Sequence, residues 1–129
     1  MEEQHPGRIT SHRDLIVWQK AMELAKLSYR LAAKFPSSET CRLVSQFTRA
    51  AASVPANIAE GHARGSRKDY ANFLAIAKGS LMETETFLVL AVRLKYLTQE
   101  QARPALSVIT EISKMLTSLR SRLLARGDL

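Results

Sequence analysis

Residues 66–94 read SRKDYANFLAIAKGSLMETETFLVLAVRL and decide the fold class of this chain. Ser66 and Asp69 stand three residues apart, in the pattern of a helix-capping box. From there on, apolar residues recur at alternating steps of three and four, which places their side chains on one face of an α-helix. The members of this stripe are Tyr70, Leu74, Ala77, Leu81, Thr84, Leu88 and Ala91. The segment therefore predicts a long helix over about residues 67–95.

A second stripe follows the first along the same segment and widens its apolar face. Its members are Phe73, Ile76, Ser80, Glu83, Phe87, Leu90 and Leu94. Because two adjacent stripes are wider than the seam of a two-stranded coil, this helix is predicted to have neighbours on two sides. A carboxylate on such a face must be paired or protonated, so we predict an ion pair between Glu83 and Arg49 that fixes the helix register. A catalytic acid would have a second activated group beside it, and none accompanies Glu83, so we do not predict a catalytic role for it.

The same spacing predicts three further helices, over about residues 15–35, 39–63 and 99–125. The first begins after Asp14, a residue type that often accepts a hydrogen bond at a helix start. It ends before Pro36, whose ring cannot continue the helical hydrogen-bond ladder. It too carries two adjacent apolar stripes, which predicts contacts with more than one neighbour.

The second of these helices is interrupted by a proline. It begins after Ser37 and Ser38, which are available as caps, and contains Pro55. A proline inside a helix removes one backbone donor and obstructs the carbonyl four residues earlier, here that of Ala51. We predict a kink rather than a break, because the apolar spacing continues as far as Ile58.

Short connections join the four predicted helices. The segment Thr98-Gln-Glu-Gln101 forms another capping box and opens the last helix. Because short connections force consecutive helices to lie antiparallel, the sequence predicts an all-α fold, an antiparallel up-down-up-down four-helix bundle. We place this single domain at residues 14–126, after a flexible N-terminal tail of residues 1–13.

The chain is basic, with 19 Lys and Arg residues against 12 Asp and Glu residues and a formal net charge of +7. This balance favours polyanionic partners, although many basic bundles carry such a surplus for solubility alone. No stretch approaches the roughly 20 uninterrupted apolar residues of a membrane span, and the N-terminus lacks the segments of a secretory signal. The single Cys41 cannot form an internal disulfide, so a reducing cytoplasmic location is predicted.

Residue types that carry catalysis or bind metals do not cluster in this sequence. The histidines are His5, His12 and His62, and none pairs with another His, Cys or carboxylate at ligand spacing on one helical face. A Gly-rich phosphate loop and a nucleophile elbow are also missing. We therefore predict a non-enzymatic protein with no catalytic residues, no metal site and no cofactor.

The segment Ser53-Val-Pro-Ala-Asn-Ile-Ala-Glu-Gly-His-Ala-Arg-Gly-Ser66 resembles the signature of a bacterial family of four-helix-bundle proteins. That family is encoded in intervening sequences of 23S rRNA genes, and its members are sometimes called S23 ribosomal proteins. Further matches are Asp14-Leu-x-x-Trp-Gln-Lys-Ala21, Phe35-Pro36, Arg49-Ala-Ala51 and Ala77-Lys-Gly-Ser-Leu-x-Glu83. The resemblance covers about residues 14–97, whereas the fourth helix matches only in its hydrophobic spacing.

The resemblance implies an antiparallel bundle that assembles into a homopentamer and has no assigned enzymatic activity. A related branch is the accessory variability determinant of diversity-generating retroelements. That protein looks like the same bundle and binds both nucleic acid and a reverse transcriptase. Nothing in the sequence places this chain in that branch.

The signature segment also has a physical interpretation. Asn57 and Glu60 stand on one side of the helix beyond the proline, where they could satisfy the carbonyl freed at Ala51 or cap a neighbouring helix end. Gly61 would permit the close approach of another backbone. We interpret the following residues as a packing or subunit-interface set: Pro55, Asn57, Glu60 and Gly61, with Arg49 and Glu83. A ligand-binding role is the alternative.

Basic residues gather at two places along the chain, which are Arg64, Arg67 and Lys68 at the second corner, and Arg120, Arg122 and Arg126 near the C-terminus. The second set could instead serve as favourable charge at the negative end of a helix. Since aromatic residues make up only 6% of the chain and stand mostly at core spacing, phosphate contact is the favoured mode of nucleic-acid binding. The leading hypothesis is a homopentameric adaptor that binds RNA or DNA; the alternative is a scaffold for a protein partner such as a reverse transcriptase.

Overall fold

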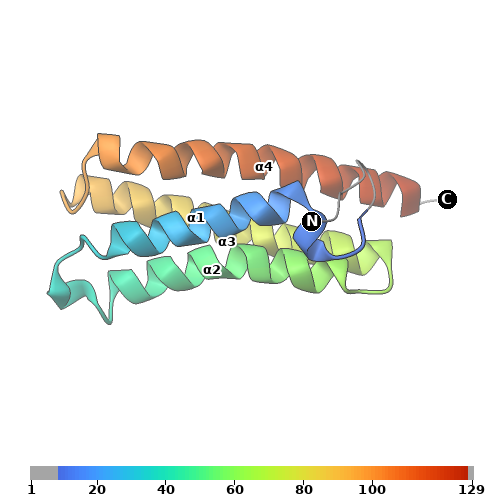
Figure 1. Cartoon of the computed structure of the whole chain (residues 1–129), viewed down its shortest axis with the longest axis horizontal. Helices are drawn as coiled ribbons and strands as arrows, with labels where there is room; N and C mark the ends of the chain where they lie inside the picture. The colour runs from blue at the N-terminus through green and yellow to red at the C-terminus, as the bar shows by residue number, and fades with distance from the viewer. Residues whose placement is uncertain (1–8, 128–129) are drawn as a thin grey trace, which may run out of the picture.

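The protein forms a bundle of four long antiparallel helices, as its computed structural model shows for residues 9–127 (Figure 1). The helices are α1 (Ile16–Ala32), α2 (Leu43–His62), α3 (Arg67–Arg93) and α4 (Gln99–Gly127), with short 3-10 turns η1 (His12–Asp14) and η2 (Ser37–Glu39). Consecutive helices pack against each other, and α4 also packs against α1. The prediction of an all-α four-helix bundle is therefore confirmed.

One apolar stripe of each helix fills the core, because only one side of a bundle helix can face its neighbours. In α3 the stripe from Leu74 to Ala91 is buried, as predicted. In α1 the buried stripe runs from Val17 to Leu31 and continues to Phe35 beyond the helix, whereas Met22 and Tyr29 of the neighbouring stripe are exposed. The stripe of α1 that contains Met22 and Tyr29, and the second predicted stripe of α3, thus add apolar surface to the molecule rather than widening its core.

The N-terminal approach to α1 differs from the prediction. Residues 1–8 of the predicted tail lie outside the described residues, and the end of that tail forms η1. Asp14 is not the N-cap of α1; Leu15 holds that position without a side-chain hydrogen bond. The Asp14 carboxylate instead accepts hydrogen bonds from the Thr10 amide and hydroxyl, both at 2.9 Å, and from the Ser11 amide at 3.2 Å. These donors, the Thr10 amide first, lower the pKa of Asp14.

The corner between α1 and α2 is longer than predicted. Ser37 and Ser38 do not cap α2, because they belong to η2 and the helix starts only at Leu43. The N-cap position belongs to Arg42, which makes no capping hydrogen bond through its side chain; the Leu43 amide donates instead to Glu39 Oε1 at 3.2 Å. Glu39 Oε2 accepts a hydrogen bond from the Tyr96 hydroxyl at 2.7 Å, which links this corner to the corner between α3 and α4. The Tyr96 hydroxyl and then the Leu43 amide lower the pKa of Glu39 by stabilising its charged form.

The second half of α2 packs closely against the start of α3. The helix continues through Pro55, which is buried, so the predicted continuity is confirmed. Gly61 is buried against α3: a Cβ atom there would lie 2.7 Å from the Phe73 Cβ and 3.2 Å from the Tyr70 carbonyl oxygen. The predicted close approach of another backbone at Gly61 is therefore confirmed.

The corner between α3 and α4 is closed by backbone hydrogen bonds. Lys95 has φ 68°, the left-handed conformation that ends many helices. The Lys95 amide donates to Val92 O at 3.0 Å and the Tyr96 amide to Ala91 O at 2.9 Å, which satisfies two carbonyls at the end of α3. The predicted capping box at the start of α4 is confirmed: the Gln101 amide donates to Thr98 Oγ1 at 3.0 Å, and the Thr98 amide to Gln101 Oε1 at 2.9 Å.

Gly61→Ala is predicted to destabilise the bundle. The added methyl would overpack the α2–α3 contact, at a typical cost of about 1–3 kcal/mol, against a gain in helix propensity of up to about 1 kcal/mol. Gly79→Ala in α3 is the matched control, because a Cβ atom at Gly79 meets no other atom within 4 Å. We expect urea unfolding to show a net loss of stability for Gly61→Ala and a gain or no change for Gly79→Ala; equal effects would contradict the close-packing account.

Tyr96→Phe is predicted to lower the free energy of unfolding at neutral pH, with an effect that shrinks in acid. The folded pKa of Glu39 lies below its ordinary value, so the stabilisation is present above about pH 4.3 and is lost as the pH falls through the folded pKa. Thermal unfolding of both proteins between pH 7 and pH 3 measures this. Tyr29→Phe, at an exposed tyrosine, serves as the control, and a difference that stays constant with pH would rule out the contact with Glu39.

Candidate nucleic-acid interface

The corner between α2 and α3 carries the first predicted basic set. Arg64, Arg67 and Lys68 are all exposed, on the connecting segment and the first turn of α3. Ser66 caps that turn, because its Oγ accepts a hydrogen bond from the Asp69 amide at 3.1 Å. The unpaired amides at a helix start carry partial positive charge, so the first turn of α3 adds to the positive field of its cations.

Arg64 is held in place by two contacts. Its Nη2 lies 3.2 Å from Glu60 Oε2, one helical turn earlier, and its guanidinium lies 4.7 Å from the centre of the Phe73 ring. The ion pair is exposed on both sides, so its contribution to stability is small and solvent screens it. The contacts fix the direction of the guanidinium, and four of its five N–H donors are left for another partner.

Arg120 and Arg122 of the second basic set differ in their exposure. Arg120 is half-buried, and its Nε donates to the Ala71 carbonyl of α3 at 3.1 Å. Arg122 is exposed, whereas the side chain of Arg126 lies outside the described residues. Figure 1 places the end of α4 beside the corner between α2 and α3, so the two basic sets share one end of the bundle. We call this the basic end, and define it by Arg64, Arg67, Lys68, Arg120 and Arg122.

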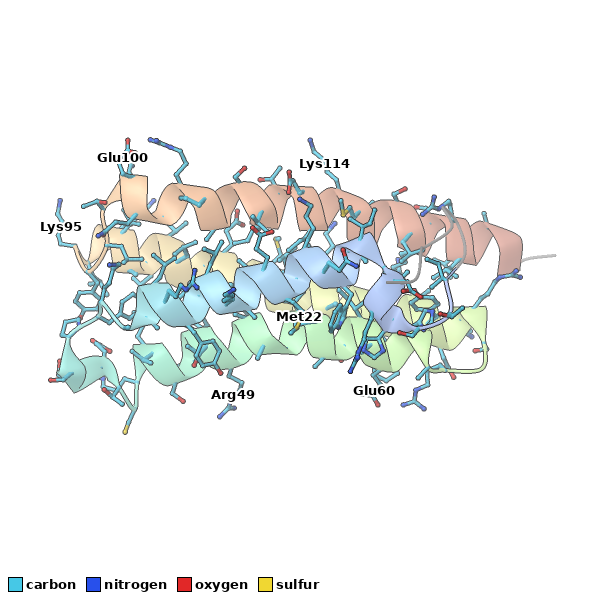
Figure 2. The ribbon with its side chains drawn as sticks, in the orientation of Figure 1. Met22, Arg49, Glu60, Lys95, Glu100 and Lys114 are labelled. Atoms are coloured by element: carbon cyan, nitrogen blue, oxygen red, sulfur yellow. The ribbon has the colours of Figure 1, made fainter. Side chains whose placement is uncertain are left out.

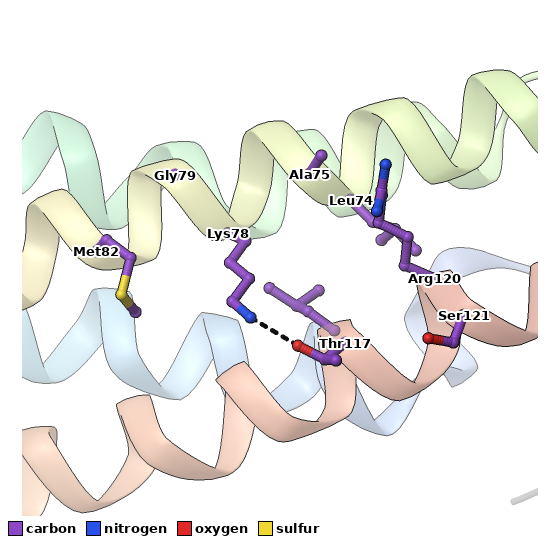
Figure 3. Close-up of a pocket in the computed structure, with 9 residues that line it drawn as sticks. Leu74, Ala75, Lys78, Gly79, Met82, Thr117, Arg120 and Ser121 are labelled. Atoms are coloured by element: carbon purple, nitrogen blue, oxygen red, sulfur yellow. Dashed lines mark hydrogen bonds between the residues drawn. The ribbon is translucent and has the colours of Figure 1, made fainter. Parts of the chain in front are cut away.

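A groove of about 300 Å³ between α3 and α4 leads away from the basic end (Figure 3). Lys78 and Arg120 line it from opposite helices, and the Lys78 Nζ donates to Thr117 Oγ1 at 2.6 Å. Lys78 was not among the site residues predicted from the sequence. Its neighbour Gly79 was the available signal, because a glycine inside a long helix leaves space beside the residues around it.

The predicted ion pair between Arg49 and Glu83 is wrong. Both residues are exposed, and they are not within ion-pair distance of each other. Figure 2 shows Arg49 and Glu60 projecting from α2 away from the bundle. The pair was expected because Glu83 was assigned to a buried stripe, whereas Glu83 itself faces outward and water solvates its carboxylate.

Asn57 makes a local contact rather than the predicted ones. Its Nδ2 donates to the Ser53 carbonyl at 2.8 Å and to Ser53 Oγ at 2.9 Å, and neither the Ala51 carbonyl nor a neighbouring helix end is its partner. Ser53 Oγ in turn lies 2.9 Å from Ser80 Oγ, so a short polar chain joins α2 to α3. Glu60 pairs with Arg64, as described above. Asn57 thus contributes to the packing of α2 against α3, whereas Glu60 is exposed and contacts Arg64 at the surface.

The outer face of α3, defined as Phe73, Ile76, Glu83, Phe87, Leu90 and Leu94, carries more apolar side chains than an ordinary polar helix surface. The exposed fractions of Ile76, Leu90 and Leu94 are 51%, 40% and 45%, and the two phenylalanines are half-buried. Large exposed apolar patches mark interaction surfaces more often than chance.

Metal-ligand clusters and membrane spans are both absent from the part of the chain that the structure describes. Among residues 9–127, no group of three or more His, Cys, Asp or Glu side chains is placed to hold a metal ion. None of the helices described is both long enough and apolar enough to cross a membrane.

The fold defines the class of this protein as an antiparallel four-helix bundle with one basic end. The chain belongs to the family of 23S rRNA-intervening sequence proteins, whose family model matches residues 13–118. It is similar to a protein of unknown function from the S23 ribosomal protein family of Bacteroides thetaiotaomicron, known from a 1.70 Å crystal structure. The two are 34% identical with a TM-score of 0.74, over 81% of this chain and 98% of the other. No functionally curated protein matches the chain.

Proposed function

We propose that this protein is a non-enzymatic homo-oligomer that binds RNA or DNA through backbone phosphates at its basic end. The observation that carries the proposal is the meeting of two basic sets, far apart in the sequence, at one end of the bundle. Phosphate contact is the favoured mode because the five residues that define that end are all cations, and residues 63–69 include no aromatic ring on which bases could stack. Such binding carries little sequence preference and depends strongly on salt.

Self-assembly would multiply this weak attraction. The outer face of α3 supports it, because burial of exposed apolar surface is the main driving force of association. Met22 and Tyr29 of α1 form a second exposed apolar surface on a different helix. Two different surfaces suit the head-to-tail contacts that close into a ring, and family resemblance implies a homopentamer. A ring would repeat the basic end, and each further phosphate contact would then be intramolecular.

The outer face of α3 also favours a second candidate function. An apolar face that carries a single carboxylate could receive a protein of another sequence, so the chain would act as an interaction scaffold. A reverse transcriptase is the partner that the related retroelement branch suggests. In that case the charge of the basic end would serve solubility.

Neutralising the corner is predicted to weaken RNA binding. The variant Arg64→Gln, Arg67→Gln, Lys68→Gln should reduce affinity for a structureless RNA by at least about tenfold at low salt. It should also flatten the plot of log affinity against log salt by about 0.7 for each phosphate that the variant no longer neutralises. Fluorescence anisotropy across a series of salt concentrations measures both quantities.

The matched control removes three positive charges elsewhere. Lys26, Lys34 and Lys114 are exposed and lie outside the basic end, so the variant with glutamine at all three has the same net charge as the corner variant. Equal losses of affinity in the two variants would mean that only net charge matters. Unchanged binding in the corner variant would remove the corner from the interface.

A further inference from the structure

The groove between α3 and α4 has the shape of a small ligand site. Ala75 and Gly79 face it from α3, and Thr117 and Ser121 from α4, so small side chains one turn apart stand on both helices. A Cβ atom at Gly79 would meet no other atom within 4 Å, which leaves this stretch of the interface unfilled. A volume of about 300 Å³ lies at the lower limit of ligand pockets and suits a mononucleotide rather than a large cofactor.

Two cations face this space, and no carboxylate lines it. The hydrogen bond from Lys78 to Thr117 and the one from Arg120 to Ala71 hold both side chains across the groove, as Figure 3 shows for Lys78. Each cation keeps spare donors, because an ammonium has three and a guanidinium five, and these contacts use one apiece. Neither forms an ion pair with a carboxylate of the described residues.

Hydroxyl groups and apolar atoms complete the lining. Thr117 Oγ1 accepts from Lys78, so its own proton is free to donate, and Ser121 offers another hydroxyl on the same side. Leu74, Leu116 and Met82 supply apolar surface, and Met82 is 37% exposed. Methionine sulfur makes favourable contacts with aromatic rings. The lining thus combines donors for an anion with a surface for a flat ring.

We infer that this groove binds one phosphorylated nucleoside unit, with the phosphate between Lys78 and Arg120 and the base against Met82 and the small residues of α3. The unit is a free nucleotide or one residue of a nucleic-acid strand; the latter source rests on the function proposed above. The groove thus provides a place where a base is held, in addition to the phosphate contacts at the corner.

The test is a titration of the full-length, isotopically labelled protein followed by amide NMR shifts, with uridine 5′-monophosphate, uridine, inorganic phosphate and a short oligouridylate as probes. The monophosphate should shift amides of residues 75–82 and 117–121, and should bind at least about tenfold more tightly than uridine, because charge-assisted hydrogen bonds hold its phosphate. Gly79→Leu fills the groove without a clash at its Cβ and should weaken monophosphate binding by at least about tenfold. Lys78→Gln should weaken it to a similar degree.

Lys114→Gln is the control, since Lys114 is exposed on α4 and points away from the bundle (Figure 2). Equal weakening in Lys114→Gln and Lys78→Gln, or full binding in Gly79→Leu, would overturn the inference, as would the absence of monophosphate shifts in the groove. An oligouridylate that displaces the monophosphate and is itself weakened by Gly79→Leu would identify a strand as the source. Monophosphate binding that the oligouridylate does not disturb would identify a free nucleotide.

This titration and the anisotropy measurement of RNA binding together separate the groove inference from the proposed function. If the corner variant loses RNA while the monophosphate leaves the groove amides unshifted, the groove inference fails and the proposed function stands. If Gly79→Leu abolishes monophosphate binding in a protein that binds no RNA, the groove stands and the proposed function fails.

Discussion

The close approach of α2 and α3 at Gly61 is the constraint on which the rest of the bundle depends. A methyl group there would stand 2.7 Å from the Phe73 Cβ, so the helices meet at this distance only because residue 61 has no side chain. Farther along the same pair, Ser53 and Ser80 lie within hydrogen-bond distance. The connection between the two helices is correspondingly short, and it presents Arg64 and its basic neighbours at one end of the molecule.

The packing of α2 against α3 also sets the rotation of α3, and that rotation produces two further surfaces on which function is proposed. With Ser80 turned toward α2, the stripe from Leu74 to Ala91 enters the core and the outer face of α3 is left to solvent or to another chain. The side that carries Gly79 turns toward α4, where the lack of a side chain leaves a groove. The basic corner, the outer face of α3 and the groove beside Gly79 thus all follow from the way α2 and α3 pack together.

The fold was predictable from the sequence because the spacing of apolar residues reports a helix wherever it forms. Spacing does not say which of two adjacent stripes faces the core, and this is why Glu83 was assigned to a buried face and given a partner, Arg49, that it does not contact. Helix starts were mispredicted where a side chain acts across the fold, as Glu39 does between Leu43 and Tyr96. The basic corner was visible in the sequence, whereas the groove depends on how α3 and α4 meet.

We propose that a basic end, repeated by self-assembly, binds the nucleic-acid backbone. The most direct test is to measure the mass of the particle in solution. Light scattering of the nuclease-treated protein, alone and with a structureless RNA at low and at physiological salt, measures assembly and binding together. The account predicts a particle of about five chain masses that takes up RNA at low salt and releases it steeply as salt rises. A particle of one chain mass, or an assembled particle that takes up no RNA at either salt concentration, would contradict it.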